Sequence, residues 1–446
     1  MSSTRHRSQS DPVQDAAGHQ AVADGMSAAE GIKPLLRAVL GDDPPVRFEF
    51  WDGTALGPSD SPGVVRVNSP NAVRRILWSP DQLGLGRAYV TGELDIAGDV
   101  FQVLEALRDR VQPNVKFNTR AVLATASAAR RLHAIGPPPA PPPEEASPSR
   151  GPRHSKARDA AVVRHHYDVG NDFYRIVLGP AMTYSCARFA DPDMSLADAQ
   201  AAKHDLICRK LGLHEQPGKR LLDVGCGWGS LAIHAASHYD VEVVGITISQ
   251  PQVELARQRV ADAGLADRVD IRLQDYRDMH GETFDAISSV GMFEHVGAKR
   301  MALYFERLYQ LLMPAGRLLN HAISSVNGSA MSGRSFVGRY VFPDGELIDV
   351  SAVQRAMEQV GFEIRDVESL REHYAKTLRQ WVANLETAWD RAVSLVGAAR
   401  ARIWRLYMAA SAIGFEDGGI NVHQVLGVKT TPTGVAAMPP TRRDWN

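Results

Sequence analysis

The sequence predicts an α/β protein with one mostly parallel sheet, preceded by a smaller α+β domain. From about residue 160 onward, short apolar runs alternate with helical patterns, as in βαβ units whose helices cover both faces of a parallel sheet. In residues 219–238, one such run leads through closely spaced glycines into a helix. Upstream, six of the residues in 137–143 are prolines, which cannot continue a helix or a sheet ladder and therefore separate two domains.

Composition narrows the class of protein. The 446 residues contain 50 Lys plus Arg and 51 Asp plus Glu, so no overall charge points to nucleic acid as a partner. Three widely spaced cysteines, Cys186, Cys208 and Cys226, argue against a disulfide framework and fit a reducing cytoplasm. No apolar run is long enough to span a bilayer, and residues 1–11 lack the apolar core of a secretory signal. We therefore expect a soluble or peripheral cytoplasmic protein.

The chain divides into five predicted segments. Residues 1–28 are polar and without periodicity, and we expect them to be disordered. The other segments are a small domain at 29–135, a Pro-rich linker at 136–155, the sheet domain at 156–430 and a flexible tail at 431–446. Within the small domain the patterns predict a helix at 33–40, strands at 46–51 and 64–67, a glycine-spaced loop at 84–95 and a helix at 100–107.

Five strands are predicted in the sheet domain. They cover residues 221–224, 241–246, 269–273, 284–288 and 317–323. The intervening helices begin near Ser230, Ser249 and Tyr304, a further helix covers 351–360, and one long helix covers 374–412. Basic residues between Arg150 and Arg164 fit contact with anionic headgroups or a solvated helix equally well.

The glycine-rich turn is Asp223-Val-Gly-Cys-Gly-Trp-Gly229. Alternate glycines let the backbone approach a ligand closely, and the helix that follows offers free N–H donors. The dinucleotide fingerprint would need its third glycine at position 230, where this chain has Ser230. The turn resembles the first motif of Rossmann-like S-adenosylmethionine methyltransferases, and a purely structural glycine turn is the alternative.

Polar residues follow the predicted strands, where ligands bind in open parallel sheets. Thr247, with Gln252 one helical turn later, stands where most methyltransferases have the acidic residue that binds ribose. Asp275 and Tyr276 follow the next strand and suit an adenine ring. Glu294, after the fourth strand, and His321, after the fifth, would place a carboxylate and an imidazole at one crevice. Taken singly, Glu294 is explained equally well as a helix cap, and His321 as a histidine of the hydrophobic core.

Several motifs together resemble the cyclopropane fatty acid synthase family from residue 160 to about 430. They are His166-Tyr-Asp-Val-Gly-Asn171, Tyr184-Ser-Cys186, the glycine turn, Gly245-Ile-Thr-Ile-Ser249, Ser289-Val-Gly-Met-Phe-Glu-His-Val-Gly297, His321-Ala-Ile323, Tyr374-Ala-Lys-Thr-Leu378 and Trp404-Arg-Leu-Tyr-Met408. A threonine at the ribose position, Thr247 here, is itself typical of that family. Residues 166–171 and 182–187 precede the cofactor strand, and we expect them to form a lid.

The resemblance implies two small ligands. S-adenosylmethionine would be held by Tyr184, Ser185, Asp223, Gly225, Cys226, Gly227, Gly229, Thr247, Gln252, Asp275 and Tyr276. A bicarbonate ion would be held by Cys186, Glu294, His321, Tyr374 and the backbone of Ile323. No metal is implied: His234 and His238 have zinc-like spacing, but no glutamate stands between them and no third ligand is in view.

The resemblance also implies a reaction. The methyl group would pass to the cis double bond of an unsaturated acyl chain in a phospholipid, and bicarbonate would deprotonate the carbocation to close a cyclopropane. Two alternatives are a methylene product that needs a partner reductase and a non-catalytic lipid-binding protein on the same fold. The small domain would bind lipid, and the protein would act as a peripheral protein at the inner face of the cell membrane. A homodimer is compatible with the resemblance, and no nucleic acid is expected as a partner.

Overall fold

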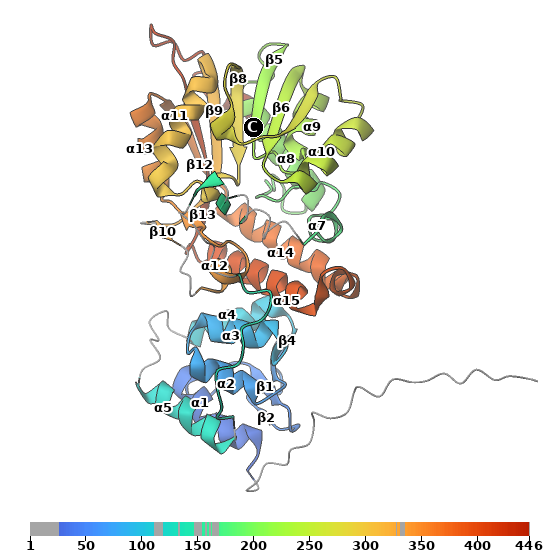
Figure 1. Ribbon diagram of the computed structural model, residues 1–446, viewed down its shortest axis with the longest axis vertical. Helices are drawn as coiled ribbons and strands as arrows, with labels where there is room; N and C mark the ends of the chain where they lie inside the picture. Colours follow the sequence, from blue (N-terminus) through green and yellow to red (C-terminus); the bar gives the residue numbers. More distant parts are fainter. Residues whose placement is uncertain are drawn as a thin grey trace, which may run out of the picture.

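The computed structural model describes residues 26–110, 119–132, 134–146, 154–156, 158, 159, 162, 169–326, 328–330 and 335–445. Two parts are stacked along the long axis of the molecule, and helices α14 (Arg371–Thr387) and α15 (Trp389–Glu416) lie between them (Figure 1). Among the described residues, no helix is both long and apolar enough to cross a membrane.

The N-terminal part is a four-stranded sheet covered by helices. Its strands β1 (Arg47–Phe50), β2 (Ala55–Leu56), β3 (Gly63–Val67) and β4 (Leu94–Gly98) are ordered β2-β1-β3-β4, and β1 and β3 are parallel. Its helices are α1 (Ala28–Leu40), α2 (Asn71–Trp78), α3 (Gln82–Val90), α4 (Val100–Arg110) and α5 (Thr119–Arg131). Helix α1 begins at a capping box in which Ser27 and Glu30 satisfy each other's backbone N–H groups.

The loop predicted at 84–95 is wrong, because α3 runs through Gly84 and Gly86. Asp81 starts this helix by accepting hydrogen bonds from the N–H groups of Leu83 and Gly84. A β-carbon on Gly84 would lie 2.0 Å from the Ser79 carbonyl oxygen, and one on Gly86 would lie 2.5 Å from the Phe336 ring. These glycines allow close packing of a helix rather than a loop.

The larger part contains a seven-stranded sheet of order β12-β13-β9-β8-β5-β6-β7. Its strands are β5 (Lys219–Val224), β6 (Val241–Thr247), β7 (Val269–Leu273), β8 (Phe284–Val290), β9 (Leu312–Ser324), β12 (Glu363–Ser369) and β13 (Asn421–Val428). Strands β5 to β9 pair in parallel, whereas β13 is antiparallel to both of its neighbours. The predicted α/β fold with a mostly parallel sheet is confirmed.

Helices cover both faces of this sheet (Figure 1). They are α8 (Leu196–Lys210), α9 (Ser230–His238), α10 (Gln250–Asp262), α11 (Met301–Leu311) and α13 (Val350–Val360). Helix α7 (Asn171–Leu178) instead contacts α14 and α15, and α12 (Phe336–Tyr340) contacts α15. A short pair, β10 (Ser329–Ala330) and β11 (Glu346–Leu347), lies beside them. The long helix predicted at 374–412 is instead α14 and α15, separated at Ala388, and α15 is kinked at Gly397, whose φ is 81°.

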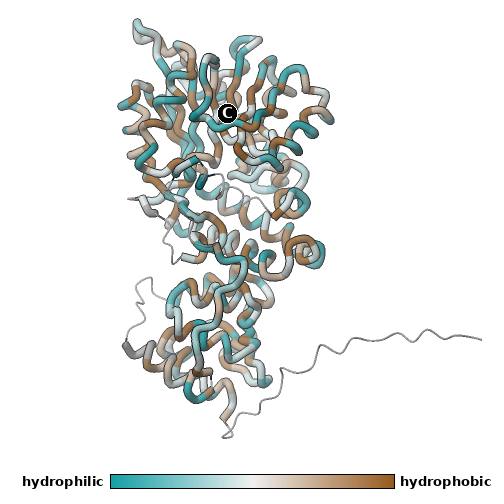
Figure 2. The backbone as a smooth tube through the Cα atoms, in the orientation of Figure 1, coloured by the Kyte–Doolittle hydropathy of each residue, from teal (hydrophilic) through white to brown (hydrophobic). Residues whose placement is uncertain are grey.

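The two parts share one hydrophobic core, so the small domain is not an independent unit. Hydrophobic stretches continue through the helices between the parts (Figure 2), and the buried residues Phe48, Tyr89, Trp381 and Trp404 belong to one cluster. Arg405 of α15 is buried and donates hydrogen bonds to the carbonyl oxygen of Ile96 and the hydroxyl of Tyr89.

The predicted linker is docked rather than free. The Arg75 guanidinium donates a hydrogen bond to the Ala140 carbonyl oxygen, and the Trp78 indole donates one to the Gly136 carbonyl oxygen. Glu145 forms ion pairs with Arg87 of the N-terminal part and Arg339 of α12. The Pro-rich segment therefore connects the two parts in an extended but fixed path.

The predicted loose tail is wrong as well, because the described part of it packs on the sheet domain. Trp445 is buried in the cluster beneath α8 and α9, and Arg442 forms an ion pair with buried Asp366. Arg317 donates a hydrogen bond of 2.7 Å to the Ala437 carbonyl oxygen. A Pro- and Thr-rich composition did not reveal these long-range contacts.

Candidate active site

The glycine turn closes the carboxyl end of β5. Gly225, Gly227 and Gly229 have φ values of 76°, 55° and 77°, in the left-handed region that side chains disfavour. A β-carbon on Gly225 would lie 2.9 Å from Cγ of Met292, which comes from the loop after β8. The turn is therefore shaped so that backbone, rather than side chain, lies beside whatever occupies the crevice.

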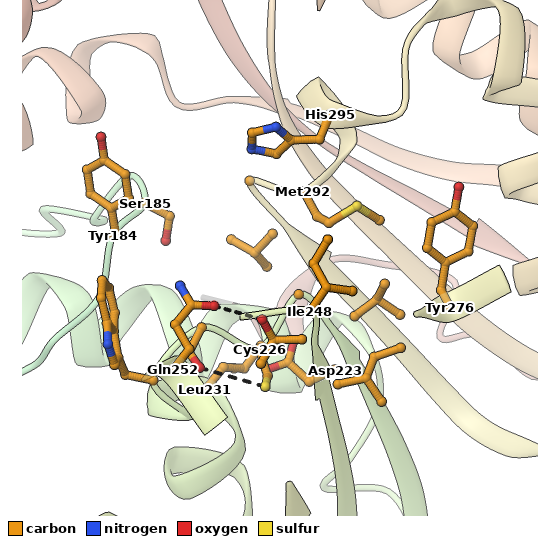
Figure 3. A pocket seen from close by; sticks show the side chains of 18 of the residues that line it. Tyr184, Ser185, Asp223, Cys226, Leu231, Ile248, Gln252, Tyr276, Met292 and His295 are labelled. Atoms are coloured by element: carbon orange, nitrogen blue, oxygen red, sulfur yellow. Dashed lines mark hydrogen bonds between the residues drawn. The ribbon is translucent and has the colours of Figure 1, made fainter. Parts of the chain in front are cut away.

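A pocket opens at these strand ends, as Figure 3 shows. Ten of the eleven residues predicted to hold S-adenosylmethionine line it, and Gly229 does not. The ten are Tyr184, Ser185, Asp223, Gly225, Cys226, Gly227, Thr247, Gln252, Asp275 and Tyr276. Met182 and Thr183 also line the pocket, so the expected lid segment at 182–187 forms part of its wall, whereas His166-Tyr-Asp168 lies outside the described residues.

Two polar residues of the pocket, Thr247 at the end of β6 and Gln252 in the first turn of α10, pair with each other. The Thr247 hydroxyl donates a hydrogen bond of 2.7 Å to Oε1 of Gln252 and accepts one from the Ser249 N–H. Both side chains are buried. Because Oε1 of Gln252 accepts from Thr247, the orientation of the Gln252 amide group and of its N–H donors is fixed. The pair offers a neutral, preorganised contact in place of a carboxylate.

The acidic residues that line the pocket, Asp159, Asp223 and Asp275, differ in their surroundings. Asp223 is buried and accepts a hydrogen bond of 2.8 Å from the Ser288 hydroxyl, and burial raises its pKa to about 6. Asp275 instead accepts hydrogen bonds from the Arg277 guanidinium at 2.6 and 2.9 Å. Arg277 also pairs with Asp159 at 3.1 Å, and both residues line the pocket. Sequence reasoning did not identify this ionic group at the pocket edge.

We call Cys186, Glu294, His321, Ile323 and Tyr374 the anion cluster. Glu294 accepts a hydrogen bond of 2.7 Å from the Ile323 N–H through Oε1, while its buried Oε2 has no partner among the described residues. His321 Nδ1 lies 3.3 Å from the amide nitrogen of Gln424, and its buried Nε2 likewise lacks a described partner. Two polar atoms of this cluster are thus left for a ligand.

The anion cluster carries little formal charge of its own. Burial raises the pKa of Glu294 to about 7 and lowers that of His321 to about 3. Burial also raises the pKa of the Cys186 thiol, so this side chain stays protonated. The imidazole is therefore neutral near neutral pH, and the carboxyl group titrates there.

Hydrogen bonds through the backbone of Leu370 and Val422 connect Cys186 and Tyr374 of the anion cluster to strand β9, which carries Ile323. The Cys186 thiol and the Tyr374 N–H both donate to the Leu370 carbonyl oxygen, and the Leu370 N–H donates to that of Val422. Val422 is the register partner of Ile323 in the β13–β9 pairing. None of the five lines the cofactor pocket itself, but Met292 and His295, on either side of Glu294, do.

A group of packed aromatic rings includes Tyr184 of the pocket and Tyr374 of the anion cluster. The Tyr184 ring centroid lies 5.3 Å from that of Trp381, 5.6 Å from Tyr174 and 5.8 Å from Trp404. Tyr374 packs at 4.6 Å against Phe415. The side chains come from α7, α14, α15 and the loop before α8, and they make an apolar wall suited to a water-poor site.

Sequence reasoning missed Gln200 and Lys203 of α8. Gln200 donates a hydrogen bond of 2.9 Å to the Ser185 carbonyl oxygen, and the Lys203 ammonium donates one of 2.9 Å to the Ser185 hydroxyl. Both side chains are buried, and a helix pattern alone offers no sign of their contact with residue 185. The zinc-like histidines, His234 and His238, stack at 4.3 Å, and no group of three potential metal ligands occurs in the described part of the chain.

Comparison with known proteins identifies relatives of this chain. Residues 154–425 match the family model described as mycolic acid cyclopropane synthetase. The chain is 42% identical over 414 residues to a probable fatty acid methyltransferase of Mycobacterium tuberculosis, covering 90% of this chain and 94% of the relative. It is 36% identical over 376 residues to the cyclopropane-fatty-acyl-phospholipid synthase of Escherichia coli, covering 84% of this chain and 90% of that protein.

A solved structure resembles the larger part. The mycolic acid cyclopropane synthase CmaA1, complexed with S-adenosylhomocysteine and CTAB, is 36% identical with a TM-score of 0.57. The match covers 60% of this chain and 98% of that protein. The predicted Rossmann-like methyltransferase fold is confirmed by this comparison.

Proposed function

Because this chain belongs to the mycolic acid cyclopropane synthetase family, we propose that it converts an unsaturated acyl chain of a phospholipid into a cyclopropane. It is an S-adenosylmethionine-dependent methyltransferase, and the family acts on fatty acyl chains. The observation that carries the finer proposal is the pair of unpartnered atoms, Oε2 of Glu294 and Nε2 of His321, in a cluster next to the cofactor pocket.

The residues present fit S-adenosylmethionine. Glycines with positive φ keep the crevice open, and Thr247 with Gln252 offers neutral polar contacts for a ribose. Both Asp223 and Tyr276 line the pocket, where the buried carboxyl group would contact the methionine part of the cofactor and the ring would contact the adenine. When bound, the cofactor supplies an electrophilic methyl group. The protein's own contribution is to align that methyl with the double bond in a dry site, where orientation lowers the barrier.

The anion cluster fits bicarbonate by the chemistry of its donors and acceptors. The amide nitrogen of Gln424 can only donate, so Nδ1 of His321 accepts this hydrogen bond and carries no proton. In the neutral imidazole the proton is then on Nε2, the atom without a described partner, which can donate to the ion. Glu294 would accept the hydroxyl proton of the ion through its unpartnered oxygen. Bicarbonate would supply a small base for proton removal, as the reaction requires after methyl transfer. The Ile323 N–H is already bonded to Glu294, so that residue orients the carboxyl group.

Membrane association belongs to the same proposal, because the proposed substrate lies in a bilayer. Exposed apolar side chains occur on the N-terminal part at Trp78, Leu123 and Ile135, and Trp78 contacts the backbone of Gly136 next to Ile135. Replacing Trp78 and Leu123 by serine should reduce sedimentation with anionic phospholipid vesicles about tenfold. Leu303→Ser, an exposed leucine of the larger part, is the matched control, and equal loss in both proteins would contradict this surface.

The decisive experiment follows the lipid product. The protein is incubated with S-adenosylmethionine and oleoyl phosphatidylethanolamine vesicles, and extracted lipids are analysed by proton NMR. Upfield cyclopropyl signals support the proposal. Vinylidene signals would instead establish a methylene product that needs a reductase partner, because the two products are isomers of equal mass. Unchanged lipids from a protein that binds S-adenosylmethionine would contradict the proposed phospholipid substrate.

A further inference from the structure

Two buried lysines on α8 differ in their partners. Lys203 and Lys210 are each 1% exposed and stand two helical turns apart. The Lys210 ammonium pairs with Asp366 at 2.8 Å and also with Glu368. The Lys203 ammonium contacts the Ser185 hydroxyl at 2.9 Å, and it forms no ion pair with any carboxylate of the described residues.

A buried ammonium without a counter-ion is costly, because burial removes its hydration without replacing it. Three N–H donors are available on Lys203, and the described residues use one of them. Burial lowers its pKa to about 8, whereas the nearby Cys186 and Asp223 act in the opposite direction. The group is therefore charged at neutral pH and lacks the carboxylate that balances Lys210.

The Lys203 ammonium, which has the nearby Asp223 but no direct ion pair among the described residues, lies beside the anion cluster. Ser185, which accepts the hydrogen bond from Lys203, directly precedes Cys186 in the chain. Burial is the main cause of the low pKa of His321, and Lys203 is its largest charged contributor. The members of the cluster bring no cation of their own, since His321 is neutral and the Cys186 thiol is protonated. An anion bound there would meet one buried positive charge.

We propose that Lys203 is the counter-charge of the bicarbonate ion, acting as a positioning residue through Ser185 and through space rather than as a direct ligand. This inference rests on the proposed function, because bicarbonate is part of that proposal. The bound anion would supply, at longer range, the negative charge that Asp366 and Glu368 supply to Lys210 by direct contact. Loss of the charge should weaken bicarbonate more than S-adenosylmethionine, which is itself cationic.

The test is a calorimetric titration of the full chain with bicarbonate, with a parallel titration with S-adenosylmethionine. Lys203→Met should raise the Kd for bicarbonate at least about tenfold and leave that for S-adenosylmethionine within about twofold. Lys203→Arg keeps the charge and should retain bicarbonate within about threefold. Lys33→Met, at an exposed lysine of the N-terminal part, controls for net charge. Unchanged bicarbonate affinity in Lys203→Met would overturn the inference.

The wild-type protein provides a second test that does not depend on the folding of Lys203→Met. Bicarbonate affinity should fall as the pH rises through about 8, because the Lys203 ammonium then loses its proton. Glu294, whose pKa burial raises to about 7, also becomes anionic in the lower part of this range, so the comparison with Lys203→Arg separates the two groups. A flat affinity between about pH 7 and pH 9, or a fall that is the same in Lys203→Arg, would overturn the inference. The other titratable groups coupled to this ammonium are Cys186, His204, Cys208, Asp223, His234 and His321.

Failure of the inference and failure of the proposed function are distinguishable, because binding is measured without turnover. A wild-type protein that methylates lipid but binds no bicarbonate overturns the role of Lys203 and leaves methyl transfer standing. A protein that binds bicarbonate in a Lys203-dependent way but leaves lipids unchanged supports the role of Lys203 and contradicts the proposed reaction.

Discussion

The cofactor pocket and the anion cluster are neighbours that the chain builds in different ways. Most of the pocket lies at the carboxyl ends of neighbouring strands of one parallel sheet, from Asp223 near the end of β5 to Tyr276 after β7. The cluster instead combines a loop before α8, the turn after β8, strand β9 and helix α14. A repeated topology positions the first region, whereas packing between distant segments positions the second.

The cofactor pocket and the anion cluster also differ in their charged groups. The pocket edge holds an ion pair between Asp275 and Arg277, which is charged near neutral pH. The cluster holds a neutral imidazole, a protonated thiol and a carboxyl group whose pKa is about 7. Under the proposed function, a cationic cofactor would be bound in one of these environments and a proton would be transferred in the other. Variants should therefore separate binding from turnover.

The largest effect is expected for Glu294→Gln. The amide cannot accept and release a proton as the carboxyl group does, so turnover should fall about 100-fold or more. The Kd for S-adenosylmethionine should stay within about twofold, because Glu294 does not line the pocket. Steady-state kinetics and equilibrium binding provide the two measurements. Glu306→Gln, at an exposed position of α11, is the control, and full activity of Glu294→Gln would remove the cluster from the reaction.

Tyr374→Phe removes one hydroxyl from the same cluster and keeps the ring that packs on Phe415. Turnover should fall about tenfold or more through lost positioning of the anion, with little change in cofactor affinity. Single-turnover assays with saturating S-adenosylmethionine measure this directly. Tyr309→Phe is a control outside the site, and an equal loss there would point to a general effect on stability.

Gly225→Ala should weaken cofactor binding, whereas the two preceding variants should lower turnover. Its β-carbon would face Met292 at 2.9 Å on a backbone with φ of 76°, so the Kd for S-adenosylmethionine should rise about tenfold. Gly218 has a similar φ of 74° but open space around it, and Gly218→Ala should change stability rather than affinity. Equal cofactor affinity in both variants would contradict close approach of ligand and backbone at Gly225.

The smallest effect concerns acid stability. The unfolded chain binds a proton on His321 below its ordinary pKa of 6.5, whereas the folded protein does not until about pH 3. The free energy of unfolding therefore falls as the pH falls through this window, by about 2 kcal/mol at about pH 5. Urea denaturation of His321→Gln should show a shallower dependence between about pH 6.5 and pH 5. Exposed His238→Gln should keep the wild-type slope, and identical slopes in all three proteins would place His321 in solvent contact.

Local patterns were enough to predict the elements that carry the cofactor pocket. Thr247 and Gln252 could be placed because one ends a strand and the other lies in the first turn of the next helix. The glycines at 84 and 86 misled the same reasoning, because close packing against Ser79 and Phe336 requires glycine as much as a loop does. Composition also misjudged the tail, whose Trp445 is buried by contacts from α8 and α9.

Local patterns were sufficient to predict the α/β class, the glycine turn and the polar residues at the strand ends, because each depends on neighbours a few positions away. Three features became visible only in the folded chain: the shared core between the two parts, the link from Glu294 to Ile323 and the burial of Lys203 without an ion pair among the described residues. Those features depend on burial and on partners from distant segments. Burial sets the pKa values and the cost of an unpaired charge, and no local pattern of residues records it.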